Sequence, residues 1–288
     1  MMEGNRPAAS RLRLALLLPV LLAFTACASI ERMALPKASL ADTHWRDHDR
    51  GAVAAVDHGP WDRFLGRYVV TDAAGVNRLR YASVTEADKK ALAAYIKSLA
   101  AAPVSRLSRD GQRAFWIDLY NALTVNLVLD HYPVSSVRKI KPGFFSIGPW
   151  DMKLVSVEGR PLSLNDIEHR ILRPLWGDAR LHYALNCAAV GCPDLAAGAY
   201  TAENTEQRLE AGARAYINNP RGVAFDDKGR LVLSKIYIWF REDFGGTTEG
   251  VLKHLRHYAA PALQARLTGS PRIGKYRYDW SLNDAGGK

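Results

Sequence analysis

The chain has 288 residues, of which 48% are hydrophobic, and its formal net charge is +10. This length allows one large domain or two small ones with an ample core. The basic residues are scattered without a run of five Lys or Arg, which excludes the charge block typical of a nucleic-acid-binding tail.

The N-terminus predicts an exported protein. Arg11 and Arg13 precede an apolar run over residues 14–24, which is the layout of a secretory signal. The run is shorter than the roughly 20 residues that a membrane-spanning helix needs. We therefore expect a signal peptide over residues 1–26.

The end of this signal resembles the lipobox of bacterial lipoproteins. The resemblance rests on residues 22–27, with Phe24 at a position that usually holds Leu. It implies that Cys27 is acylated and becomes the new N-terminus, and stable anchoring requires more than one acyl chain. The alternative is ordinary signal cleavage near Ala26 or Ala28, which would release a soluble periplasmic protein.

Export also limits the expected partners. Lipidation would place the protein in the bacterial cell envelope, on the outer membrane and facing the periplasm, where nucleic acid is not a partner. The membrane contact would be made through the lipid anchor. For a basic chain, an envelope protein, peptidoglycan or another anionic envelope component is then the expected partner.

The folded domain is expected to occupy residues 61–288, after a lipidated cysteine and tether over residues 27–60. Three-to-four-residue apolar spacing predicts helices over residues 85–102, 111–132 and 202–217. Hairpins are expected at residues 154–160 and 223–233, and alternation over residues 181–187 predicts a half-buried strand. Together these elements predict an α+β fold, with several helices packed on a small, mainly antiparallel sheet.

Several motifs, in this order, resemble the family called domain of unknown function 547. The likeness covers a core of about residues 111–245, with Asp118 where the family usually has Asn. The matching segments are Ala114-Phe-Trp-Ile-Asp-Leu-Tyr-Asn-Ala-Leu123, Ser163-Leu-Asn-Asp-Ile-Glu-His-Arg-Ile-Leu-Arg173, His182-Tyr-Ala-Leu-Asn-Cys187, Gly191-Cys-Pro193, Leu233-Ser234, Trp239-Phe240, Asp243-Phe244 and Tyr278-Asp-Trp-Ser-Leu-Asn283. This resemblance implies a domain but no reaction.

Cys187 and Cys192 are the candidate chemical centre. In an oxidising compartment they could form a disulfide, because Gly191 gives the short intervening loop its freedom. They could also be inert thiols, or Cys187 could be a nucleophile at the end of the predicted strand.

A thiol nucleophile needs a base, and the sequence offers His169 and His182. Asp166 lies three residues before His169 on a predicted capped helix, so its carboxylate could orient that imidazole. The alternative for both histidines is structural hydrogen bonding.

Other polar residues are candidates for the wall of a cleft, namely Asp118, Asn121 and Glu168. The two residues on the long apolar helix could equally be buried groups that bind neighbouring backbone. No cofactor is expected, since no glycine-rich phosphate loop occurs. No metal site is expected either, because the closely spaced histidine pairs lack further ligands.

Two functions remain open. The first is a cell-envelope binding or assembly module in which the two cysteines form a structural pair, and it is favoured by the plant members of the resembling family, which are linked to protein assembly. The second is a thiol-dependent hydrolase or acyl-transfer enzyme with a papain-like mechanism that uses Cys187. A free Cys187 thiol would favour the enzyme.

Overall fold

The computed structural model describes residues 35–51, 55–141, 143, 148–269 and 271–286, and it has the predicted α+β architecture. Two large clusters of buried side chains form most of the described core, a larger one around the long helix and a smaller one around a three-stranded sheet, and a small third cluster contains Cys187, Ala189 and Cys192. None of the helices in the described ranges combines the length and apolar composition needed to cross a membrane. The signal peptide and Cys27 lie outside the described residues.

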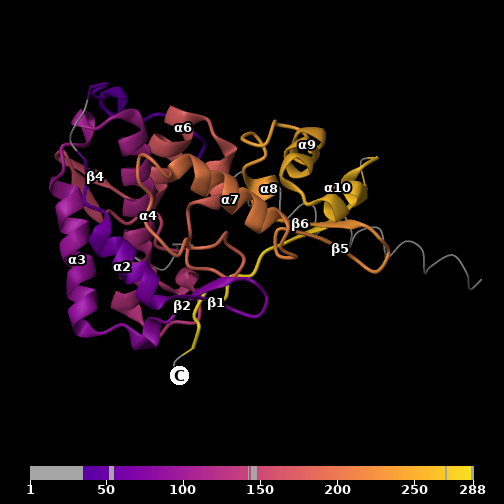
Figure 1. Ribbon diagram of the computed structural model, residues 1–288, viewed down its shortest axis with the longest axis horizontal. Coiled ribbons are helices and arrows are strands. Elements are labelled where there is room, and N and C mark those ends of the chain that lie inside the picture. The colour runs from indigo at the N-terminus through magenta and orange to yellow at the C-terminus, as the bar shows by residue number, and fades with distance from the viewer. Residues whose placement is uncertain (1–34, 52–54, 142, 144–147, 270, 287–288) are drawn as a thin grey trace, which may run out of the picture.

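Helix α4 (Arg109–His131) is the centre of the larger cluster. Ser108 caps its N-terminus by accepting a hydrogen bond from the Gly111 amide, and Tyr132 is its C-cap residue. Side chains are buried on every face of its middle turns, as expected for a helix inside a domain. The predicted helix over residues 111–132 is therefore confirmed, with α3 (Glu86–Ala101) packed beside it (Figure 1).

Short helices and two hairpins complete the larger cluster. The predicted hairpin at residues 154–160 is confirmed, and its turn residues Glu158 and Gly159 have the positive φ angles, 46° and 76°, that favour a tight hairpin. The remaining elements here are α2 (Gly59–Tyr68), β1 (Val69–Thr71), β2 (Asn77–Leu79), η2 (Tyr81–Ser83), η3 (Val104–Arg106), η4 (Val137–Lys139), β3 (Val155–Val157) and β4 (Arg160–Leu162).

The smaller cluster is built on a sheet with the order β5-β6-β7. The predicted hairpin is present as the antiparallel pair β5–β6, whereas β7 is added in parallel to β6. Its elements are α7 (Thr205–Ile217), β5 (Val223–Phe225), β6 (Leu231–Ser234), α8 (Ile236–Trp239), α9 (Thr248–Tyr258), α10 (Pro261–Leu267) and β7 (Ile273–Arg277).

The C-terminal tail connects the two clusters. After β7 the chain runs back toward β2, as the yellow trace in Figure 1 shows. It forms isolated bridges between Leu282 and Ala189 and between Asp284 and Leu79. This path places the aromatic residues of the tail between the sheet and the helical part.

The described part of the segment expected to be a tether packs against the domain. Trp45 of η1 (Thr43–Arg46) is 4% exposed and stacks edge-on against Trp116 of α4. The Arg109 guanidinium and the Gln112 amide of α4 donate to backbone carbonyls of this segment. The folded body therefore begins well before Trp61.

The strand expected over residues 181–187 is wrong. The chain forms η6 (Ala179–Tyr183), started by the Asp178 carboxylate that accepts from the Arg180 amide, and then an irregular loop. Residues 181–189 are all buried, so the apparent alternation does not separate a core face from a solvent face. Side chains and the C-terminal tail satisfy the backbone groups of this loop: Asn121 and Asn186 bind backbone groups of residues 184–188, and the Asn283 amide donates to the Ala188 carbonyl.

The helix that was expected after residue 163 changes type along its length. Ser163 and Asp166 form the predicted capping box at the start of α5 (Leu164–Ile167). The chain continues as the π-helix η5 (Glu168–Leu172) and then as α6 (Arg173–Trp176). Such wide turns are rare and occur frequently at functional sites.

Candidate functional site

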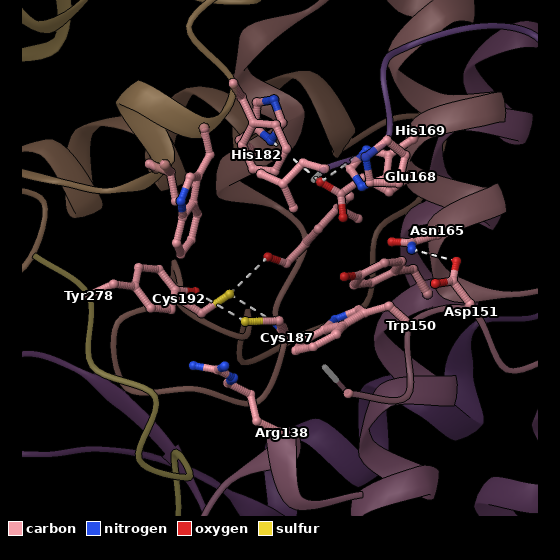
Figure 2. Close-up of a pocket in the computed structure, with 18 of the residues that line it drawn as sticks. Arg138, Trp150, Asp151, Asn165, Glu168, His169, His182, Cys187, Cys192 and Tyr278 are labelled. Carbon is pink, nitrogen blue, oxygen red and sulfur yellow. Dashed lines mark hydrogen bonds and ion pairs between the residues drawn. The ribbon is translucent and has the colours of Figure 1, made fainter. Parts of the chain in front are cut away.

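A cavity of about 700 Å³ lies where the π-helix, the loop after η6, helix α8 and the C-terminal tail meet. This volume falls within the range of pockets that hold small ligands. Figure 2 shows Cys187 and Cys192 inside it, with Arg138 to one side and Glu168, His169 and His182 to the other. The described lining residues are Leu35, Pro36, Tyr120, Arg138, Gly143, Gly148, Trp150, Asp151, Asn165, Glu168, His169, His182, Leu185, Cys187, Cys192, Pro193, Ile236, Trp239, Phe240, Tyr278 and Trp280.

Buried side-chain amides hold the loop that carries Cys187 in place. Asn121 of α4 donates to the Ala184 carbonyl and accepts from the Asn186 amide, both at 2.9 Å. Asn186 in turn accepts from the Ala188 amide and donates to the Pro193 carbonyl. Ala188 has a φ of 61°, a left-handed conformation that is uncommon for a residue with a Cβ. The loop is thus held in an unfavourable backbone conformation directly beside the thiol.

The Cys187 thiol is free and buried, and several donors surround it. Hydrogen bonding with Cys192 is the largest influence on its pKa and lowers it, whereas burial raises it. Hydrogen bonds with the Tyr278 hydroxyl, at 3.1 Å, and with the Ala189 amide lower it further. The net result is a pKa below the ordinary value, which favours the thiolate.

The pKa of Cys192 is shifted in the opposite direction. Burial is the main reason that its pKa is raised well above the usual value, and the neighbouring Cys187 adds to the effect. Its sulfur accepts a hydrogen bond from the Cys187 amide at 2.9 Å. Both cysteines are free, so the predicted disulfide is absent from the structure. Cys192 instead acts as a protonated neighbour of the Cys187 sulfur.

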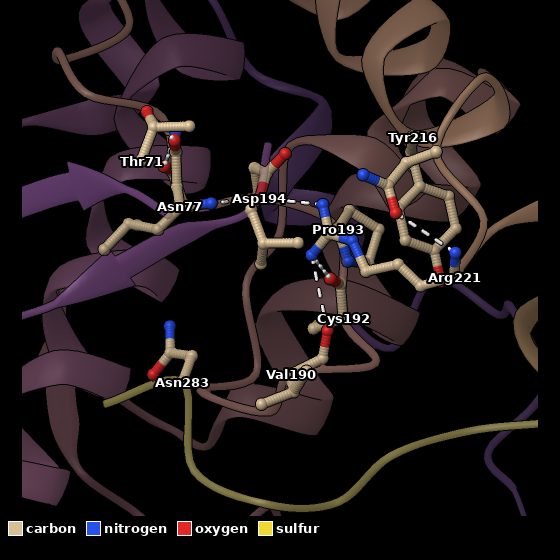
Figure 3. A network of polar contacts seen from close by, with 12 residues as sticks. Thr71, Asn77, Val190, Cys192, Pro193, Asp194, Tyr216, Arg221 and Asn283 are labelled. Carbon is tan, nitrogen blue, oxygen red and sulfur yellow. Dashed lines mark hydrogen bonds and ion pairs between the residues drawn. The ribbon is translucent and has the colours of Figure 1, made fainter. Parts of the chain in front are cut away.

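A polar network holds the cysteine loop against the rest of the domain (Figure 3). Arg221 donates to the Val190 and Cys192 carbonyls at 3.3 and 2.8 Å and pairs with Asp194 at 2.8 Å. Asp194 accepts from the backbone amide of Asn77 in β2. These contacts connect the loop to the first hairpin and to the chain after α7, which fixes the position of both sulfurs.

His169 is not placed to act as a base toward Cys187. Its Nδ1 lies 3.0 Å from Nη1 of Arg173, a group that can only donate, so Nδ1 accepts and Nε2 carries the proton. Burial lowers the pKa of His169 to about 4, with the positive charge of Arg173 contributing. The ring is therefore neutral near pH 7 and its acceptor nitrogen is already occupied.

His182 lies between two carboxylates. Its Nε2 is 2.7 Å from Oδ2 of Asp243, and its Nδ1 is 3.6 Å from Oε1 of Glu168. The ring of Phe240 stacks on it at 4.3 Å. Asp243 also receives two hydrogen bonds from Arg173, so it orients the imidazole from a fixed position.

Residues 104–217 match the family model described as protein of unknown function, DUF547. The chain carries a DUF547 domain. Searches of curated proteins and of solved structures find no match. The matched residues contain Glu168, both histidines and both cysteines of the cavity, whereas Asp243, Tyr278 and the aromatic tail lie beyond them.

Not every predicted site residue of the DUF547 domain reaches the cavity. Asp166 takes part in the capping box and pairs with Lys153 and Arg170, and within the described ranges no hydrogen bond or ion pair joins it to His169. Asn121 lies beneath the cysteine loop and is not among the described lining residues. Glu168 does line the cavity.

Asp118 belongs to a separate buried cluster. Its carboxylate lies 2.9 Å from Nδ1 of His58 and accepts from the Tyr200 amide. Burial raises its pKa despite these partners. Asp118 anchors the segment before α2 to α4 and does not contribute to the described cavity wall.

An aromatic wall of the cavity was missed by the sequence analysis. The rings of Trp150 and Trp280 are 5.6 Å apart, and those of Trp280 and Tyr278 are 4.6 Å apart. Trp239 of α8 contacts both Tyr278 and Trp280. The tail aromatics could be read from the sequence as covering the core, but nothing in their spacing connects them to Cys187.

The described residues contain no group of three or more His, Cys, Asp or Glu side chains arranged to hold a metal ion. The closely spaced histidines have other contacts: His44 binds Glu158 and His254 contacts the Tyr183 hydroxyl. Among the described lining residues, the titratable groups include two cysteines, the carboxylates of Asp151 and Glu168 and the imidazoles of His169 and His182.

Proposed function

We propose that the DUF547 domain of this chain is a thiol-dependent hydrolase or acyl-transfer enzyme in which Cys187 is the nucleophile. The observation that carries the proposal is a free thiol that lines a ligand-sized cavity and has a lowered pKa. A buried structural cysteine has the opposite shift, as Cys192 shows.

The proposed reaction begins when the Cys187 thiolate attacks the carbonyl carbon of an acyl substrate. The carbonyl electron pair moves to oxygen, and its return expels the leaving group as the C–S bond of a thioester is retained. Water then attacks the thioester, giving the free acid and restoring the thiol. In acyl transfer, an acceptor hydroxyl or amine replaces the water.

Different residues around Cys187 donate and remove protons in the proposed reaction. Burial, followed by the charges of the two cysteines, raises the pKa of Tyr278 well above its usual value, so Tyr278 keeps its proton and donates to the Cys187 sulfur. His182 is oriented by Asp243, and its Nδ1 lies 3.6 Å from the Glu168 carboxylate at the cavity wall, so in this proposal the pair holds a proton there. In this proposal that proton goes to the leaving group, and the same pair removes a proton from the attacking water.

Covalent trapping tests the proposal. The purified protein is incubated with p-nitrophenyl acetate, and peptides are examined by mass spectrometry for an acetyl group on Cys187. We expect acetylation of the wild type and of Cys192→Ser, and none of Cys187→Ser. A domain that binds ligands but leaves Cys187 unmodified would be a binding or assembly module instead, and the enzyme proposal would be overturned.

For the location of the protein, we propose an envelope lipoprotein anchored through Cys27. The support is the basic and apolar N-terminus with its lipobox-like residues 22–27. Cys27→Ser should move the protein from the membrane fraction to the soluble fraction. Wild-type protein that is soluble after export would contradict the anchor.

A further inference from the structure

The cavity has a cation, Arg138, beside its aromatic wall. The Arg138 side chain is exposed and lines the cavity, and its guanidinium carbon lies 5.2 Å from the centre of the Trp280 ring. Within the described ranges, no carboxylate forms an ion pair with Arg138. Stacking on an aromatic face holds a guanidinium in place while its N–H groups stay free to bind an anion.

The aromatic wall connects this cation to the reactive sulfur. Arg138 stacks on Trp280, Trp280 contacts Tyr278, and the Tyr278 hydroxyl binds the Cys187 sulfur. Trp150 extends the same wall along the cavity. An apolar or planar group lying against these rings would join an anion at Arg138 to a reacting carbon at Cys187.

The opposite side of the cavity has the opposite charge. Glu168 lines the cavity and lies near His182, and Figure 2 places both across the cysteines from Arg138. Asp151 is a second carboxylate in the lining, where it accepts a hydrogen bond from the Asn165 side chain. Carboxylates repel an anionic group, whereas Arg138, the one Lys or Arg among the described lining residues, attracts it, so the charges favour a ligand with a single anionic end at Arg138.

From this arrangement we infer that the substrate is an amphiphilic acyl ester whose apolar body carries one anionic group, a carboxylate or phosphate, bound by Arg138. The inference rests on the proposed thiol chemistry for the reaction but not for the binding. During turnover, the Cys187 sulfur forms a bond to the acyl carbon, the ester C–O bond breaks, and the alcohol leaves with a proton. Arg138 holds the anionic group and takes no part in bond making.

Binding is tested apart from chemistry in the Cys187→Ser background. The ligands are 4-octyloxybenzoate and its neutral amide, which cannot acylate the protein, and binding is followed by tryptophan fluorescence and calorimetry. We expect Arg138→Met to weaken benzoate binding about tenfold, since an ionic hydrogen bond contributes roughly that much, and to leave amide binding unchanged. Added salt should reduce the difference.

Two further variants sharpen the result. Arg138→Lys keeps the charge and should retain part of the preference for the benzoate. Arg106→Met removes an exposed arginine that is not among the described cavity residues and should change neither affinity. Equal effects of Arg138→Met on both ligands, or equal affinities of the unsubstituted Arg138 protein for both, would overturn the inference.

Further ligands identify the kind of anionic group that binds, and further substrates test the reaction separately from binding. Decyl phosphate in place of the benzoate decides whether a phosphate headgroup or a carboxylate is preferred, and either preference that depends on Arg138 supports the inference. Turnover is measured with 4-octanoyloxybenzoate and its methyl ester in the protein that retains Cys187. Selective binding without acylation of Cys187 would overturn the proposed enzyme while leaving the anion site in place.

Discussion

Two histidine–carboxylate pairs in this molecule look alike in composition but differ in position. His58 and Asp118 are 2.9 Å apart inside the larger core, and His182 and Asp243 are 2.7 Å apart at the cavity. Asp118 lies between α4 and the segment before α2, whereas His182 lines the cavity that contains Cys187. Residue types alone therefore do not separate a structural pair from a candidate catalytic one.

The two carboxyl groups also have opposite pKa shifts. Burial dominates at Asp118 and raises its pKa. Burial also acts to raise the pKa of Asp243, but hydrogen bonds from His182 and Arg173 outweigh it and hold the pKa well below the usual value. Arg173 makes the difference, because it is a permanent cation beside Asp243 and no Lys or Arg is named among the causes at Asp118, so the charged form is favoured at the cavity and disfavoured in the core.

Removing residues 1–60 should cause the largest loss of stability, because it removes one member of the His58–Asp118 pair. A protein that begins at Trp61 lacks both His58 and the buried Trp45. Losing a buried Trp and leaving a buried carboxylate unpaired each cost about 3–5 kcal/mol, so we expect more than about 5 kcal/mol of destabilisation. Chemical denaturation of the shortened protein and of the full chain measures it. Equal midpoints would show that residues 35–60 do not stabilise the domain.

Matched Asn substitutions compare the two carboxylates directly. Asp243→Asn leaves the buried Arg173 without its anion and should cost about 3–5 kcal/mol. Asp118→Asn keeps an oxygen that can accept from the Tyr200 amide and removes a carboxylate that burial disfavours, so it should cost about 1 kcal/mol or less. Denaturation midpoints at pH 7 give both values. The reverse order would contradict the assigned pKa directions.

The pH dependence of stability should report the buried His169. Its pKa is about 4 in the folded protein, against about 6.5 when unfolded, so the unfolded state binds more protons between these values. Through His169 alone, stability should fall by up to about 3 kcal/mol as the pH drops from about 6.5 to about 4, and His254, whose pKa burial also lowers to about 4, adds a fall of its own. His169→Gln retains an acceptor for Arg173 and should flatten this part of the profile. An unchanged slope in that variant would assign the effect to other groups.

The smallest expected effect is that of Cys192 on its neighbour. Cys192→Ala removes the largest influence that lowers the Cys187 pKa, so that pKa should rise. The change in stability should stay near about 1–2 kcal/mol, because only one buried sulfur is lost. Cys192→Ser, which keeps a donor, is the control for the pKa. A Cys187 titration that is identical in all three proteins would exclude this interaction.

Most elements of the fold were predictable because their signals are local. The apolar spacing around Leu119 predicted helix α4, and the capping-box residues from Ser163 predicted the start of α5. The residues Glu158-Gly159 predicted a hairpin turn. The loop before Cys187 was mistaken for a strand because its bonds come from Asn121, which is distant in sequence. Local periodicity contains no information about such a partner.

The cavity was predictable only in part, for the same reason. Cys187, His182 and Glu168 lie in motifs that drew attention to them, and all three line the cavity. Asp243 and Tyr278 were not assigned to the site, because their positions depend on how the tail and the turn after α8 fold back onto the loop. Tertiary contacts of this kind have no periodic signal.

The pH dependence of Cys187 alkylation is the most direct test of the central claim. Native protein is treated with iodoacetamide from pH 5 to pH 9, and labelled peptides are quantified by mass spectrometry, with Cys192 as the internal comparison. We expect Cys187 to be labelled first, with a midpoint below that of an ordinary thiol, about 8.5, and Tyr278→Phe to raise that midpoint. A Cys187 that is oxidised to a disulfide with Cys192, or that reacts no faster than Cys192 at every pH, would contradict a catalytic thiolate.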